Sequence, residues 1–215
     1  MGVALPEDEQ VVRDIILAAL RTDPERYLTA YSLEFGNVLN ADNAATLFPE
    51  YNQNRAKYRE AVHPAAQWIR DELFRRALAQ RLVPEIKNRV VFTIGGNAVG
   101  KSTALAYTGD RQKAQIVFDS TLSNPEHAKR LIAQALAAGK LVGIRYVCRP
   151  FADTFRGMLE RARTEGRVVT IDQLVNSARA AAETVRALYV EFGEDRRFEF
   201  AFVANSAEGS TRGYH

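Results

Sequence analysis

The chain has 215 residues, of which 47% are hydrophobic and 26% are charged, a size and composition that suit one α/β domain and argue against two full domains. Its formal net charge of +3, from 29 Lys and Arg against 26 Asp and Glu, fits anionic small molecules such as nucleotides and is too small to indicate nucleic-acid binding by itself. The single cysteine, Cys148, excludes an internal disulfide. No apolar stretch approaches the ~20 residues that span a bilayer, and residues 1–10 lack a signal pattern, so we expect a cytoplasmic protein without membrane contact.

Helical patterns dominate the first third of the chain. Val11–Leu20 has apolar residues at helical spacing, and Asp23-Pro24 interrupts it. Residues 1–30 therefore form an N-terminal helical segment, which could brace a sheet or act in cis on the rest of the chain. Ile15 and Ile16 favour bracing, because they suit a stripe that faces a core.

Two further segments complete this part of the chain. Phe35–Leu39 is a short apolar run that ends at Asn40-Ala41-Asp42-Asn43. Ala61–Leu82 is a long helix that Pro84 stops. Much of its apolar stripe is expected to consist of Trp68, Leu73, Phe74 and Leu78.

From residue 90 onward, strand and helix patterns alternate. The expected strands are Val90–Ile94, Ile116–Phe118, Leu141–Val147 and Phe198–Val203. The expected helices are Lys101–Tyr107, Pro125–Ala138, Phe151–Ala162 and a helix from a capping box at Thr170-Ile171-Asp172-Gln173 to about Val190. Such alternation predicts an α/β fold with a mostly parallel sheet and helices on both faces. We expect one domain over residues 1–215, with 204–215 as a flexible tail.

The strongest motif is Gly95-Gly96-Asn97-Ala98-Val99-Gly100-Lys101-Ser102, which matches G-x-x-x-x-G-K-[ST] in full. Its glycines let the backbone N–H groups point at phosphate oxygens, and the next helix presents its N-terminus to the anion. Lys101 is expected to reach the β- and γ-phosphates, and the Ser102 hydroxyl is expected to bind Mg²⁺. A chance match in a glycine-rich turn is the alternative, but a buried strand precedes the motif and a helix follows it, as a P-loop requires.

The motif predicts that the protein binds a nucleotide, but it does not identify the reaction that the protein catalyses. Switch GTPases usually carry a base-specificity motif of the N-K-x-D type, and this sequence has none. Large mechanical ATPases are much longer chains. A short P-loop protein of this kind is most often a kinase of a small molecule, with a P-loop kinase-like three-layer fold.

A kinase needs a carboxylate to accept the proton of the attacking hydroxyl, and two acids follow apolar runs. Asp42 follows Phe35–Leu39, and Asp119 ends Ile116–Phe118. The carboxyl ends of parallel strands border the ligand crevice of such folds, so both acids are candidates for a functional role. The alternative for Asp42 is a turn or helix-capping role, since Asn-Ala-Asp-Asn is good turn chemistry. For Asp119 the alternative is a polar residue at the entry to a helix.

Arginines stabilise the charge that spreads over the γ-phosphate oxygens during phosphoryl transfer. The candidates lie in Glu160-Arg161-Ala162-Arg163 and Gly166-Arg167, off the apolar face of Phe151–Ala162. A solvated helix face is the alternative account of these side chains.

Taken together, these residues resemble the zeta toxin family of P-loop kinases, the toxin halves of bacterial toxin–antitoxin pairs. The resemblance covers most of Phe35–Ser206 and includes the phosphate loop from Ile94 to Thr103. It implies that Asp42, in Val38-Leu39-Asn40-Ala41-Asp42, is the catalytic base. It also implies that Asp119 and Thr121 contact substrate, that Asp119 together with Ser102 contacts the metal, and that Arg161 and Arg167 are the phosphate-sensing arginines.

The order of the segments departs from that of the best-known members. In those proteins the phosphate loop precedes the acid segment, whereas here Asp42 precedes the loop, and Asp119 stands where Glu is expected. The resemblance implies ATP and Mg²⁺ as cofactors, a nucleotide sugar such as UDP-N-acetylglucosamine as the phosphate acceptor, and an antitoxin protein as a partner. Kinases of another acceptor, such as a dinucleotide, a nucleotide or a polynucleotide end, and a non-catalytic ATP-binding interaction module are the alternatives.

Overall fold

The computed structural model describes residues 5–80, 88–165, 169–205 and 211–214. The chain divides into two compact units, Met1–Arg76 and Ala77–His215, with the boundary in the last turn of one helix. The two units are described separately below. None of the helices in these ranges is long and apolar enough to cross a membrane.

The first unit is helical. Its elements are α1 (Glu7–Thr22), α2 (Pro24–Phe35), β1 (Val38–Leu39), α3 (Ala41–Ala45), α4 (Pro49–Gln53) and α5 (Arg59–Ala79), which continues past the unit boundary. Asp23 ends α1 and caps α2, because its carboxylate accepts a hydrogen bond from the Arg26 N–H at 3.1 Å. Pro24 is the first residue of α2, where its missing N–H costs nothing. The expected break at Asp23-Pro24 is thus a junction between two helices.

The core of the first unit differs from the predicted one. Ile16 is fully buried as expected, but Ile15 is 49% exposed. In α5, Phe74 is buried as predicted, whereas Trp68 is 42% exposed, so the prediction for Trp68 was wrong. Most of the buried stripe consists instead of the aliphatic residues Ala61, Val62, Ala65, Ala66 and Ile69.

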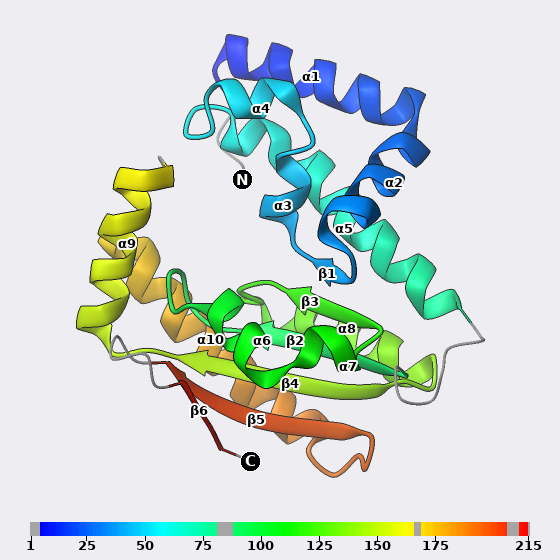
Figure 1. The fold of residues 1–215 in the computed structure, drawn as a ribbon, viewed down its shortest axis with the longest axis vertical. Helices are drawn as coiled ribbons and strands as arrows, with labels where there is room; N and C mark the ends of the chain where they lie inside the picture. Colours follow the sequence, from blue (N-terminus) through cyan, green and yellow to red (C-terminus); the bar gives the residue numbers. More distant parts are fainter. Residues whose placement is uncertain (1–4, 81–87, 166–168, 206–210, 215) are drawn as a thin grey trace. The chain divides into compact units, whose positions relative to one another are not determined.

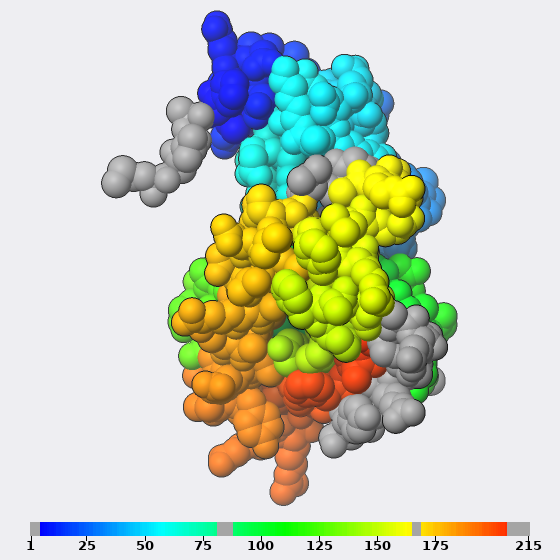
Figure 2. Space-filling view, turned by 90° about the vertical axis from the view of Figure 1, so that its left-hand side faces the viewer, coloured from blue at the N-terminus to red at the C-terminus, as the bar shows by residue number. Residues whose placement is uncertain are grey.

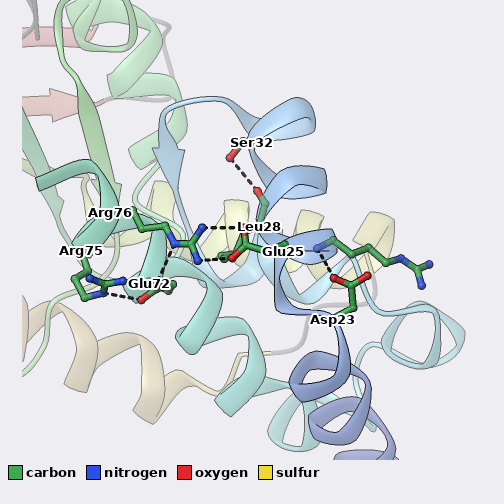
Figure 3. A network of polar contacts seen from close by, with 8 residues as sticks. Asp23, Glu25, Leu28, Ser32, Glu72, Arg75 and Arg76 are labelled. Carbon is green, nitrogen blue, oxygen red and sulfur yellow. Dashed lines mark hydrogen bonds and ion pairs between the residues drawn. The ribbon is translucent and has the colours of Figure 1, made fainter. Parts of the chain in front are cut away.

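Ion pairs join α2 to α5 inside the first unit (Figure 3). Arg76 on α5 donates to both carboxylate oxygens of Glu25 on α2, at 2.8 and 2.5 Å. Glu72, one turn earlier on α5, accepts from Arg76 at 2.8 Å and from Arg75 at 2.8 and 2.6 Å. The donating arginines lower the pKa of Glu72 from 4.5 to about 2. We refer to Glu25, Glu72, Arg75 and Arg76 as the α2–α5 ion-pair network.

The second unit is built on a sheet. Its strands are β2 (Arg89–Ile94), β3 (Ile116–Asp119), β4 (Leu141–Cys148), β5 (Phe198–Asn205) and β6 (Thr211–Tyr214). In this unit the strand order is β3-β2-β4-β5-β6; β3, β2, β4 and β5 are parallel and β6 is antiparallel to β5. The mostly parallel α/β fold predicted from the sequence is confirmed.

Helices cover both faces of this sheet. They are α6 (Lys101–Thr108), α7 (Asp110–Lys113), α8 (Pro125–Ala137), α9 (Phe151–Glu165) and α10 (Ile171–Phe192). Figure 1 shows α6 and α7 in front of the strands and α8 and α10 behind them. The capping box predicted at Thr170 is present, with Gln173 N–H donating to the Thr170 hydroxyl at 3.1 Å.

Two details of the second unit differ from the predictions. Residues 204–215 were expected to be a flexible tail, but β5 continues to Asn205 and Thr211–Tyr214 form β6. The apolar face predicted for α9 is only partly buried, because Met158 is 7% exposed while Phe151 is 57% and Leu159 is 48% exposed. Figure 2 shows the surfaces of α9, in yellow-green to yellow, and α10, in gold to orange.

A buried ion pair joins β4 to α7. Arg145 in β4 donates from Nε and Nη2 to the two carboxylate oxygens of Asp110 at 2.9 and 3.0 Å, and both residues are buried. Its Nη1 also lies 3.1 Å from a carboxylate oxygen of Glu199 in β5. The fork of donors on this guanidinium is therefore matched by carboxylates that the protein itself supplies.

Candidate nucleotide-binding site

The predicted phosphate loop connects β2 to α6, as the motif requires. β2 is buried from Val90 to Ile94, and α6 begins at Lys101. Gly100 has φ 82° and ψ 40°, in the left-handed region that favours glycine, and Ala98 also has a positive φ of 59°. Such alternation of backbone conformation turns successive N–H groups toward one side, which is how a loop of this kind makes an anion-binding concavity.

Glycine is required at Gly96 because α10 packs directly on the loop. A Cβ at Gly96 would lie 3.0 Å from the Cα of Ala178 and 3.1 Å from its backbone nitrogen. At Gly100 a Cβ would lie 2.1 Å from the Asn205 Nδ2, in addition to the strain of the positive φ. Both positions exclude a larger residue for reasons of space in the folded unit.

Two side chains far along the sequence hold the loop. Asn205, at the end of β5, donates from Nδ2 to the Val99 carbonyl at 2.9 Å. Ser177 on α10 accepts a hydrogen bond from the Asn97 N–H at 3.0 Å, and its own hydroxyl donates to the Leu174 carbonyl at 3.0 Å. Neither residue was predicted from the sequence, because nothing in the local pattern distinguishes a polar residue at a strand end or on a helix from a solvated one.

Lys101 folds back over the loop. Its Nζ donates to the carbonyls of Gly95 and Gly96, both at 3.3 Å, and the residue is half-buried. These distances are long for charge-assisted hydrogen bonds, so phosphate oxygens placed there would be better partners. Ser102 and Thr103, which follow in the first turn of α6, are exposed. The side chains that the motif assigns to phosphate and metal are therefore accessible to a ligand.

Asp119 ends the strand next to the one that leads into the loop. It pairs in register with Thr93, whose hydroxyl donates to the Asp119 carboxylate at 2.6 Å, and it is buried. Thr121 follows half-buried in the connection after β3. Across the described ranges no group of three or more His, Cys, Asp or Glu could hold a metal ion. That finding is compatible with Mg²⁺, which is commonly held by one or two protein oxygens together with substrate phosphates.

Asp42 lies in the first unit, in the first turn of α3, and is exposed. Asn40 caps α3, because its side-chain oxygen accepts a hydrogen bond from the Asp42 N–H at 2.7 Å. The fully buried Tyr31 holds the preceding backbone: its hydroxyl donates to the Val38 carbonyl and accepts from the Asn40 N–H, both at 2.7 Å. We call Val38–Asp42 the acid segment.

The surroundings of Asp42 in the first unit include His63 on α5. Desolvation lowers the pKa of His63 below its usual range, against the opposing effects of the Glu60 and Asp42 carboxylates, which raise it. A neutral imidazole is thus favoured near neutral pH.

The structure describes one of the two predicted arginines. Arg161 lies half-buried on α9, in the second unit with the loop. Arg167 lies outside the described residues, so its prediction stays untested.

The fold and the loop define a P-loop protein: a parallel sheet whose strand β2 runs through a glycine-rich loop into a helix that begins with Lys101 and Ser102. The family model of the zeta toxin matches residues 101–208, about half of the chain. The chain belongs to the zeta toxin family, which confirms the resemblance. The matched range begins at Lys101, so the acid segment and the glycine-rich part of the loop precede it.

Among solved structures, the chain is similar to one in the native crystal structure of the AvrRxo1-ORF1:-ORF2 complex. The identity is 14% and the TM-score 0.47, over 76% of this chain and 70% of that one. A search of curated proteins found no match.

Proposed function

We propose that this chain is a kinase that uses Mg-ATP to phosphorylate a hydroxyl of a small molecule. The observation that carries the proposal is the complete phosphate loop between β2 and α6, with the Lys101 ammonium held over it by two weakly bonded carbonyls. Membership of the zeta toxin family supports the same class of reaction.

In the proposed mechanism the loop N–H groups and Lys101 bind the β- and γ-phosphates of ATP. Ser102 and Asp119 would hold Mg²⁺, which supplies positive charge to the phosphate oxygens when it is bound. The buried Thr93–Asp119 hydrogen bond of 2.6 Å would orient that carboxylate. Thr121 and Asp119 are proposed to contact the substrate as well.

Asp42 is the proposed base. It would take the proton of the acceptor hydroxyl as that oxygen bonds to the γ-phosphorus and the bond to the β-phosphate oxygen breaks, which leaves ADP. The Asn40 cap and the Tyr31 hydrogen bonds fix the backbone on which Asp42 stands. Arg161 and Arg167 would stabilise the charge that develops on the transferred group.

The proposed acceptor is a sugar hydroxyl of a nucleotide sugar of the UDP-N-acetylglucosamine kind, on the strength of the family. A dinucleotide, a nucleotide or a polynucleotide end is the alternative acceptor, although the net charge of +3 gives little support for a nucleic acid. The other alternative is a non-catalytic ATP-binding module. An antitoxin protein is the proposed partner, and the cytoplasm is the proposed location.

The test is transfer of labelled γ-phosphate from ATP to a panel of acceptors: UDP-sugars, dinucleotides, mononucleotides and a 5′-hydroxyl oligonucleotide. Label on a UDP-sugar that is lost in Arg161→Ala supports the proposal, since such an arginine contributes on the order of 10³ in rate. Label on another acceptor supports a kinase of the alternative kind. Tight ATP binding without any transfer would favour the binding module.

A further inference from the structure

Arg149 stands at the end of the sheet from which the phosphate loop emerges. It directly follows β4, which pairs in parallel with β2 up to the Ile94–Tyr146 register. β2 in turn leads into the loop at Gly95. Ligands of open α/β sheets bind outside the carboxyl ends of the strands, so Arg149 occupies a position where it can reach a bound molecule.

The Arg149 guanidinium lies beside the backbone of the loop. A Cβ built on Gly157 in α9 would lie 3.2 Å from Arg149 Nη1 and 3.7 Å from the Ala98 carbonyl oxygen. Both atoms are therefore within 4 Å of one point. Because residue 157 is a glycine, α9 carries no side chain at that point and can pack closely against the guanidinium and the loop.

Within the described part of the chain, the Arg149 Nε is buried and has no hydrogen-bond partner. A buried N–H donor without an acceptor is unfavourable, and each such group in a folded protein calls for an explanation. Arg145, which lies within β4, is arranged differently, because the carboxylates of Asp110 and Glu199 surround its guanidinium. At Arg149 an oxygen from a ligand can fill that role.

We propose that Arg149 binds phosphate oxygens of the nucleotide that the loop holds. The inference rests on the proposed function, and it adds a residue that the motif does not contain. A guanidinium offers a planar fork of donors that matches phosphate oxygens, and this pairing is stronger than one between neutral groups. The absence of a side chain at Gly157 leaves room for this fork beside the loop.

The test compares Arg149→Gln with Arg156→Gln by calorimetric titration of the full chain with Mg-ATP and, separately, with inorganic tripolyphosphate. Arg156 is the matched control, because it is an exposed arginine on α9 whose partner at 3.4 Å is Asp153. Arg149→Gln is expected to weaken binding of both probes by about tenfold or more, since it removes charge-assisted hydrogen bonds. Arg156→Gln is expected to bind like the wild type.

Gly157→Ala provides a second variant that keeps Arg149. Alanine favours the helix, so this variant is expected to fold. Its Cβ would press on Nη1 at 3.2 Å, displace the guanidinium and weaken ATP binding several-fold. Wild-type affinity in both Arg149→Gln and Gly157→Ala would overturn the inference.

Three further results separate the inference from the proposed function. If Lys101→Ala loses ATP binding while both variants keep it, the proposed function stands and only the role of Arg149 fails. If Arg149→Gln weakens ATP but not tripolyphosphate, the arginine contacts the base or sugar, and the inference is again overturned. If the wild type does not bind ATP, both proposals fail together.

Discussion

The phosphate loop and the acid segment are built in contrasting ways. The loop, Gly95–Ser102, carries its own conformational requirements, with positive φ at Ala98 and Gly100 and a helix that begins at Lys101. The acid segment, Val38–Asp42, has no such signature and depends on the buried Tyr31 hydroxyl, which bonds to Val38 and Asn40. A sequence motif is easy to recognise where the proposed binding depends on an unusual backbone conformation. It is hard to recognise where the proposed role depends on a single side chain on ordinary backbone.

The polar contacts around the two regions also differ. The loop is held by neutral hydrogen bonds from Asn205 and Ser177 inside the second unit. In the first unit, the α2–α5 ion-pair network joins the helix that carries Tyr31 to α5, and it is partly exposed. The loop should therefore respond little to pH, whereas the first unit should lose stability in acid.

The largest expected effect is that of Lys101→Ala. The change removes the ammonium that we assign to the β- and γ-phosphates, so phosphoryl transfer should fall by more than about 10³, as for other groups that stabilise the transferring phosphoryl. Steady-state transfer from labelled ATP and calorimetric ATP binding measure the loss. Wild-type transfer by the purified variant would show that the loop does not hold the reacting phosphates.

Asp42→Asn tests the acid segment in the same assay. Asn keeps the shape and caps helices as well as Asp does, but it cannot accept a proton. If Asp42 is the base, turnover should fall by about 10²–10⁴ while ATP affinity and melting temperature stay unchanged. If Asp42 is only a turn residue, turnover should be unaffected.

Asp119→Asn serves as the companion variant, because Asp119 is the other acid that follows an apolar strand. Should Asp119→Asn stop transfer while Asp42→Asn does not, the base would be Asp119, and the assignment of the acid segment would be wrong. The Asp119 carboxylate accepts a hydrogen bond from Thr93 at 2.6 Å, so Asp119→Asn can also change stability. The melting temperature of this variant must therefore be measured together with its turnover.

The same contrast explains what the sequence could and could not predict. The strands β2 to β5 and the loop were predictable, because buried parallel strands are continuous apolar runs and glycines mark the loop. β6 was missed because Thr211–Tyr214 has no apolar alternation. Trp68 was placed in the core because it belongs to the apolar stripe expected for this helix, whereas the buried residues of α5 include Ala61, Ala65 and Ala66 and not Trp68. Asn205 was missed since its hydrogen bond to the Val99 carbonyl joins residues that are far apart in sequence.

Asn205→Ala and Tyr31→Phe each remove a side-chain hydrogen bond to the backbone, the first at the phosphate loop and the second at the acid segment. Asn205→Ala leaves the buried Val99 carbonyl without its donor, and Tyr31→Phe does the same to the Val38 carbonyl. Each should cost about 1–3 kcal/mol of stability. Only Asn205→Ala should also weaken ATP binding, by about tenfold, because it loosens the loop itself. Equal ATP affinity in the two variants would contradict the assigned role of Asn205.

The smallest expected effect concerns pH and the α2–α5 ion-pair network. Arg75 and Arg76 lower the pKa of Glu72 from 4.5 to about 2 in the folded chain. Because the folded value is the lower one, the stabilisation is complete above about pH 4.5 and is lost as the pH falls toward about 2. Since the Arg76 side chain is 41% exposed, solvent screening keeps this contribution to stability small.

Melting temperatures of the wild type and Glu72→Gln measure this contribution. The wild type should be the more stable at neutral pH, and the difference should shrink toward about pH 2, where Glu72 itself becomes protonated. Glu183→Gln is the matched control, because the exposed Arg179–Glu183 pair at 3.0 Å lies on α10 in the second unit. Wild-type stability in Glu72→Gln at neutral pH would mean that the network adds nothing to the first unit. The Tyr31 hydrogen bonds and the apolar core would then hold the acid segment without help from the ion pairs. The two regions would no longer differ in how strongly their stability depends on electrostatic interactions.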